Sequence, residues 1–207
     1  MGMHRPVTRA RLAGLLALAA LALSACGSSS STVAADPGST ATPSVPDASS
    51  TTSSPDVMPA SGPMLSAAGF SFHAPKGWAD VSDQAQAGVL LYAANPTDDN
   101  PLMITVRHPA HAPGTVPAAA KAAARMLGAA GGTNVKTRPA TTVGGNQTAH
   151  VTATQAQPGS HYQLDAYYVL TGSQGWVIMF ATDQYTTQSR RQAMLDSVLA
   201  TCHWASA

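Results

Sequence analysis

Charged side chains are scarce in this sequence of 207 residues. Lys, Arg, Asp and Glu together make up 10% of the chain, and the formal net charge at pH 7 is +1. Beyond the N-terminal leader, no basic run is longer than the pair Arg190 and Arg191. Nucleic-acid-binding proteins carry clustered positive charge that neutralises phosphates. The sequence therefore predicts no nucleic-acid partner.

The sequence motifs of common enzyme classes are also absent. It contains no G-x-S-x-G elbow, no P-loop, no G-x-G-x-x-G fingerprint, no C-x-x-C pair and no H-E-x-x-H helix. His108 and His111 are close in sequence, but a metal site needs three or four ligands and no carboxylate is near them. We expect exposed loop histidines there, and we predict no catalytic residue, no metal and no cofactor.

The N-terminus is the most informative segment. Arg5, Arg9 and Arg11 precede an apolar run of Leu, Ala and Gly from Leu12 to Leu23. That run is too short for a transmembrane helix, which needs about 20 residues, and it is typical of a signal peptide. Small residues then lead directly to Cys26. This pattern resembles a bacterial lipobox, so residues 1–26 are predicted to be a lipoprotein signal peptide whose Cys26 is lipidated.

Cysteine is otherwise almost missing, because Cys202 is the second and last one. If Cys26 carries the lipid, Cys202 has no partner and the domain has no internal disulfide. Residues 27–64 are rich in Ser, Thr and Pro and poor in large apolar side chains. Such a segment cannot bury enough apolar surface to order itself, so we predict a disordered linker, either bare or O-glycosylated. The expected location is the outer side of the cell membrane.

Residues 65–207 are predicted to form one α+β domain with an antiparallel β-sheet and helices packed against it. Alternating or apolar segments predict strands near residues 70–73, 89–93, 102–108, 135–143, 148–154, 162–170 and 176–181. The last three are joined by short turns, which indicates an antiparallel meander.

Two helices complete the predicted domain. Thr115 and Pro117 favour the start of a first helix, which Gly131 ends. The final helix is expected to start near Thr186 or Thr187. Its apolar stripe runs to Cys202, and Arg190 and Arg191 are expected on the opposite, solvent side.

One polar surface of the predicted sheet is a candidate binding site. Alternation places Thr105, Thr154 and Gln163, together with five candidate ligand-binding residues, on outward-facing positions of three strands. The five candidates are Arg107, His150, Thr152, Asp165 and Tyr167. A solvated sheet face without a ligand is the alternative interpretation.

Several short motifs carry a resemblance to a known family. An aromatic strand at Phe70 leads into Pro75-Lys76-Gly77-Trp78, and Thr142–Gly145, the pair Gly175-Trp176 and a closing amphipathic helix follow in order. This order resembles the LpqN-type lipoproteins of actinobacteria, whose fold is similar to that of the PsbP family. The resemblance covers most of residues 70–204. It implies an antiparallel sheet with packed helices and a non-enzymatic accessory role at the cell envelope, linked in some members to lipid export or partner proteins.

Two functions are therefore open. The first is a membrane-anchored, non-enzymatic protein that binds an envelope lipid, glycan or protein. The second is a hydrolase with an unrecognised active site on the polar sheet face, near His150 and Asp165.

Overall fold

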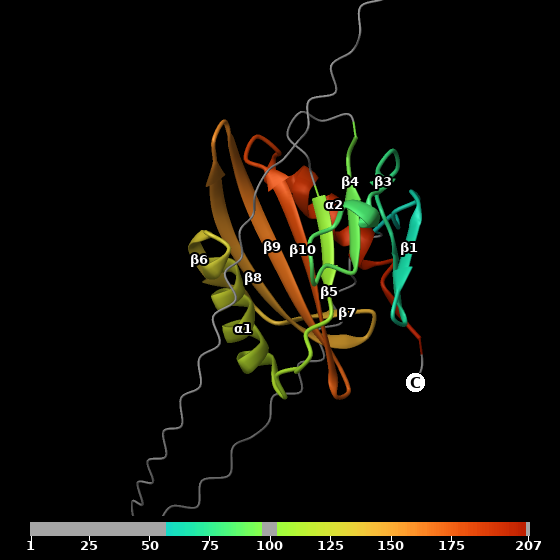
Figure 1. Cartoon of the computed structure of the whole chain (residues 1–207), viewed down its shortest axis with the longest axis vertical. Helices are drawn as coiled ribbons and strands as arrows, with labels where there is room; N and C mark the ends of the chain where they lie inside the picture. Colours follow the sequence, from blue (N-terminus) through green and yellow to red (C-terminus); the bar gives the residue numbers. More distant parts are fainter. Residues whose placement is uncertain (1–56, 97–102, 206–207) are drawn as a thin grey trace, which may run out of the picture. The chain divides into compact units, whose positions relative to one another are not determined.

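The structure is a computed structural model that describes residues 57–96 and 103–205. The predicted signal peptide, the predicted lipidation site Cys26 and most of the predicted linker lie outside the described residues. The described part belongs to one compact unit (Figure 1). Among the described residues, no helix combines the length and the apolar character needed to cross a membrane.

Strands of this unit form two antiparallel sheets. The smaller sheet has the order β1-β2-β11, with β1 at Met64–Ala67, β2 at Phe70–His73 and β11 at His203–Trp204. The larger sheet has the order β3-β4-β5-β10-β9-β8-β6, and a short strand β7 also pairs with β8. Its strands are β3 (Ala79–Asp80), β4 (Leu91–Ala94), β5 (Met103–Arg107), β6 (Thr133–Thr137), β7 (Thr141–Val143), β8 (Asn146–Gln157), β9 (Ser160–Thr171) and β10 (Gln174–Asp183).

The centre of the larger sheet is the predicted antiparallel meander. β8 pairs with β9 and β9 pairs with β10 along almost their whole lengths. β10 is apolar on both faces, as its sequence predicts: Ile178 and Phe180 are buried on one side, and Val177 and Ala181 on the other. The meander therefore separates two hydrophobic cores.

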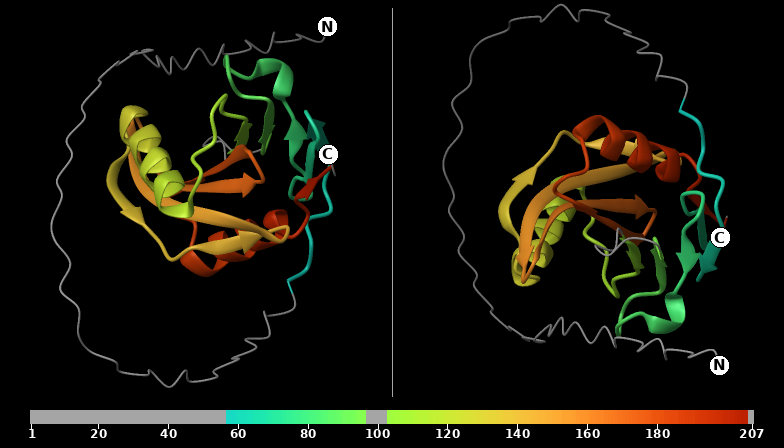
Figure 2. Two further views of the ribbon diagram at one scale, coloured as in Figure 1. Left: turned by 90° about the horizontal axis from the view of Figure 1, so that it is seen from below. Right: turned by 90° about the horizontal axis from the view of Figure 1, so that it is seen from above.

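The two helices cover opposite faces of this sheet (Figure 2). Helix α1 (Val116–Ala129) packs on the face that carries Val177, and its buried side chains are mostly alanines. Helix α2 (Gln188–Leu199) lies on the other face, together with the smaller sheet. A short 3-10 helix, η1 (Ser82–Gln84), precedes β4.

Both helices begin where the sequence predicts. The hydroxyl of Thr115 accepts a hydrogen bond from the amide of Ala118, and Thr187 does the same for Arg190. Cys202 lies past the end of α2 instead of on it, because the helix ends at Leu199. Its thiol is nevertheless buried, and burial raises its pKa to about 12.

The turn after β7 fixes the smaller sheet against the larger one. Gly144 has a φ of 52°, and a Cβ atom at this position would collide with the indole of Trp204 on β11. Glycine alone satisfies both the left-handed backbone and this close approach. The predicted turn at Gly144 and Gly145 therefore also holds the C-terminal strand in place.

The structure corrects the predicted end of the linker at residue 64. The amide of Ala60 donates to the carbonyl of Ser197 on α2 at 2.9 Å, and the amide of Gly62 donates to the carbonyl of Ala74 at 2.9 Å. The imidazole Nδ1 of His73 lies 3.0 Å from the carbonyl of Gly62. The composition of residues 57–63 suggested a linker. Backbone hydrogen bonds nevertheless attach this segment to the domain, and such bonds cannot be predicted from composition.

We predict that a chain beginning at residue 64 is less stable than one beginning at residue 57. The shorter chain loses the hydrogen bonds of Ala60 and Gly62, each of which contributes about 1 kcal/mol net. Urea unfolding at pH 7 should show a lower midpoint, with a free energy of unfolding smaller by about 1–3 kcal/mol. Equal midpoints would contradict a structural role for this segment.

Candidate functional site

The predicted polar face does not exist as one surface, because the strand register divides its residues. Residues paired across an antiparallel sheet share a face. Arg107 pairs with Val177, which pairs with Tyr168, and this row faces α1. His150 pairs with Tyr167, and this row faces α2.

The remaining candidates follow the same register. Thr105 lies with Arg107 on the α1 face, whereas Thr152 and Asp165 lie with His150 on the α2 face. Placing Arg107 beside the other four candidates was therefore wrong. Alternation within each strand was correct, but the relative phase of two strands depends on their pairing, which the sequence does not show.

Three of the candidates do form a cluster on the α2 face. The imidazole Nε2 of His150 lies 2.9 Å from Oδ1 of Asp165. The ring of Tyr167 stacks on the imidazole, with centroids 4.2 Å apart and an angle of 9° between the planes.

Helix α2 supplies the fourth member of this polar cluster of His150, Asp165, Tyr167 and Arg191. The guanidinium Nε of Arg191 lies 3.7 Å from Oδ2 of Asp165. Arg191 was predicted on the solvent side of the helix, and this prediction is wrong because the helix turns this residue toward the sheet. Asp165 is 5% exposed; its Oδ1 is hydrogen-bonded to His150, whereas Oδ2 has no hydrogen-bond partner among the described residues and lies nearest to the guanidinium of Arg191.

The environment of Tyr167 excludes it as a nucleophile near neutral pH. Burial raises the pKa of this phenol strongly, and the carboxylates of Asp165 and Asp196 raise it further. Among the described residues, no hydroxyl or thiol forms a hydrogen bond with His150. The cluster thus has a base and the group that orients it, without the activated nucleophile of covalent hydrolases.

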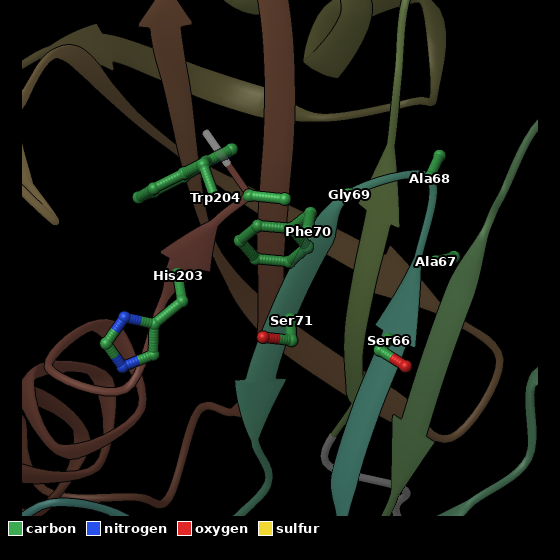
Figure 3. Close-up of a pocket in the computed structure, with 9 residues that line it drawn as sticks. Ser66, Ala67, Ala68, Gly69, Phe70, Ser71, His203 and Trp204 are labelled. Atoms are coloured by element: carbon green, nitrogen blue, oxygen red, sulfur yellow. The ribbon is translucent and has the colours of Figure 1, made fainter. Parts of the chain in front are cut away.

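A shallow groove lies at one end of the smaller sheet (Figure 3). Its volume is about 380 Å³, and strands β1, β2 and β11 form it. The rings of Phe70 and Trp204 lie at one end, 5.2 Å apart, and the imidazole of His203 points away from them. Ser66, Ser71 and His203 are aligned across the three strands, but within the described part of the chain no hydrogen bond joins their side chains. The groove combines small polar groups with apolar walls, which Phe70, Trp204 and alanines provide.

A second pocket, of about 420 Å³, lies beside α1, and we call it the α1 pocket. Ala122 and Met126 of the helix form one wall, Tyr168 and Val177 of the sheet form its floor, and Pro109 of the loop before α1 closes it. His111 and Arg125 also line it. Ligand pockets commonly have volumes of roughly 300–1,000 Å³ and combine apolar walls with a few polar groups.

Two contacts hold the loop that closes the α1 pocket. The imidazole of His108 stacks on the indole of Trp176, with centroids 4.5 Å apart and an angle of 14°. A Cβ atom on Gly175 would overlap the ring of Tyr168 and approach Ala112 at 3.1 Å. Gly175 therefore lets the tyrosine ring lie flat beneath the loop.

Polar groups without partners lie on the same sheet face as this pocket. Arg107 is half-buried, and among the described residues its guanidinium has no ion pair or hydrogen bond. Desolvation lowers the pKa of its guanidinium. The hydroxyl of Thr105 is buried without a hydrogen-bond partner. Arg107 was predicted from the sequence, but the pocket was not; its signals were the proline-flanked loop before α1 and the small residues of that helix.

Comparison with known proteins identifies the fold. No protein-family model matches the chain, and no curated protein sequence matches it. The structure is similar to that of the Saccharomyces cerevisiae Ran-binding protein Mog1p, with a TM-score of 0.51 and 13% identity over 67% of this chain and 91% of Mog1p. The domain has a Mog1-like fold. The predicted α+β class, an antiparallel sheet with packed helices, is confirmed.

Two further structures are similar at lower scores. LpqN, involved in cell envelope biogenesis of Mycobacterium tuberculosis, matches with a TM-score of 0.48 and 13% identity over 66% of this chain and 83% of LpqN. Cyanobacterial PsbP from Synechocystis matches with a TM-score of 0.49 and 16% identity over 73% of this chain and 97% of PsbP. The chain also spans about half (49%) of a protein from Bacteroides thetaiotaomicron. These identities do not establish membership of the LpqN family.

We predict that the polar cluster stabilises the domain. Asp165→Asn removes the charge that balances His150 and Arg191, and should lower the free energy of unfolding by about 1–3 kcal/mol. Asp83→Asn is the matched control, because Asp83 is an exposed aspartate. Urea unfolding at pH 7 compares them, and equal losses for both variants would contradict the structural role.

Proposed function

We propose that this chain is a lipoprotein held at the outer side of the cell membrane through Cys26, and that its domain binds an envelope component without converting it. The ligand class is a lipid, a glycan or a protein partner. The location rests on the leader, the short apolar run and the small residues before Cys26. A role in lipid export is the finer form of the proposal and rests on the resemblance to LpqN-type lipoproteins.

The observation that carries the binding role is that His150 and Asp165 already make contacts inside the domain. Both groups are used inside the fold, since Tyr167 covers the imidazole and Arg191 balances the carboxylate. A general base must reach the proton that it removes from substrate or nucleophile. The α1 pocket, on the opposite face of the sheet, offers volume and apolar walls without such a pair.

A hydrolase is the second candidate function, and one observation favours it. A histidine oriented by a buried carboxylate at 2.9 Å is the arrangement that serves as a general base in many hydrolases. His150 has a 17% exposed side chain, so its ring is not fully enclosed. The two functions differ in what His150→Ala and Asp165→Asn should do.

The anchoring part is tested with Cys26→Ala. The thiol is the acceptor of the lipid, so the variant should lack the acyl group and should appear as precursor or as soluble protein. Fractionation of cells grown with a clickable palmitate analogue measures both properties. A Cys26→Ala variant that is processed, labelled and retained in membranes would overturn the anchor.

The binding part is tested by searching for turnover. The chain from residue 27 onward is incubated with a panel of ester, glycoside and phosphoester substrates. We expect no turnover that depends on His150 or Asp165. Hydrolysis that His150→Ala abolishes, while Asp83→Asn has no effect, would overturn the proposal and establish the hydrolase.

A further inference from the structure

The α1 pocket is lined by Arg125 and His111, and the segment of the chain that forms most of it has no acidic residue. Between Asn100 and Leu164 the chain contains no acidic residue, and it contains no glutamate at any position. The same segment has five basic residues, namely Arg107, Lys121, Arg125, Lys136 and Arg138. The whole chain has a net charge of only +1, so positive charge is concentrated in the segment that includes β5, α1 and the loop between them.

Cationic groups lie at defined positions relative to the apolar part of the pocket. Arg125 is an exposed residue of α1 and lines the pocket, one position before Met126. His111 lines it from the loop. Arg107 lies one strand away from the floor, paired with Val177, and it has no acidic partner among the described residues. A guanidinium that is partly desolvated without a counter-ion gains from a bound anion.

The floor and one wall of the α1 pocket are apolar. Val177 and Tyr168 are 2% and 3% exposed, so the protein already shields them from water, whereas Ala122 and Met126 are half-buried and leave apolar surface that a ligand could cover. An ion without a hydrocarbon part would leave this apolar surface of α1 uncovered. A neutral hydrocarbon would leave Arg107 and Arg125 without a partner.

We infer that the α1 pocket binds the hydrocarbon chain of a single-chain anionic amphiphile, whose carboxylate or phosphate head lies at Arg125 with Arg107 adding to the local positive charge. This inference rests on the proposed function and names the ligand class for it. The volume of the α1 pocket, about 420 Å³, is suitable for a single hydrocarbon chain. Arg125 is thus a binding residue, and Ala122 determines how much of the hydrocarbon fits.

The first test is a chain-length series. Binding of octanoate, decanoate and dodecanoate to the chain from residue 27 onward is measured by calorimetry below their micelle concentrations. Each methylene that enters the pocket should tighten binding about fourfold, which corresponds to about 0.8 kcal/mol. Dodecyl phosphate distinguishes the two anionic heads, and dodecyl maltoside gives the affinity of a chain with a neutral head.

Matched variants locate the site. Arg125→Gln should weaken dodecanoate binding about threefold to tenfold, as expected for a partly exposed charge. Lys121→Gln removes the same charge one turn earlier on α1, outside the pocket lining, and should have a smaller effect. Ala122→Phe should fill the pocket and weaken binding at least about tenfold, whereas Ala129→Phe, at an exposed position of the same helix, should not.

Several outcomes would overturn the inference. The first is an affinity that does not change with the length of the hydrocarbon chain. The second is an equal loss of dodecanoate affinity in Arg125→Gln and Lys121→Gln. The third is equal affinity for dodecyl maltoside and dodecanoate. Thermal melts will show whether Ala122→Phe folds. If it does not, the comparison of Arg125→Gln with Lys121→Gln remains as the test. If the domain retains an envelope lipid or glycan but no anionic amphiphile, this inference falls and the proposed function stands. Turnover of a substrate that depends on His150 overturns the proposed function instead.

Discussion

Strands β9 and β10 bury side chains on both faces, and this double burial organises the domain. Tyr168 and Val177 face α1, whereas Tyr167 and Ile178 face α2. A sheet that is apolar on both sides needs a covering layer on each. The alanine-rich α1 provides one layer, and α2 with the smaller sheet provides the other. The two helices and the smaller sheet therefore have their positions set by these two faces, whereas the remaining strands extend the sheet at its edges.

The same constraint explains why the polar residues of β8 and β9 have structural partners. Asp165 lies in the middle of a strand that is covered on both sides, so its carboxylate cannot reach bulk water. A buried charge is tolerated only with opposite charge and hydrogen bonds. His150 meets this need from the neighbouring strand and Arg191 from α2. The polar cluster thereby ties α2 to the sheet at a defined position.

Much of this fold could be predicted from the sequence, because its signals are local. Thr115 and Thr187 cap their helices, the turns after β8 and β9 are short, and β10 is apolar on both faces, all as expected. The candidate site was predicted less well, because it depends on relations between segments. His150, Asp165 and Tyr167 do lie together, whereas Arg107 is on the other face and Arg191 was not included. Register and helix rotation decide both cases, and neither can be read from the period within a single element.

Arg107 shows how alternation within a strand and register between strands combine. Alternation within β5 correctly predicted that this residue points away from Ile104 and Val106. Once the register is known, that direction is toward the α1 side, where the described chain supplies no carboxylate. Asp165 cannot pair with it, because the body of the sheet separates them. Asp165 therefore has its partners on the α2 face, whereas the partly desolvated Arg107 lies on the α1 face without one among the described residues. No carboxylate of the described residues pairs with Arg107, and the apolar pocket next to its row of the sheet favours a ligand that is both anionic and hydrocarbon-rich.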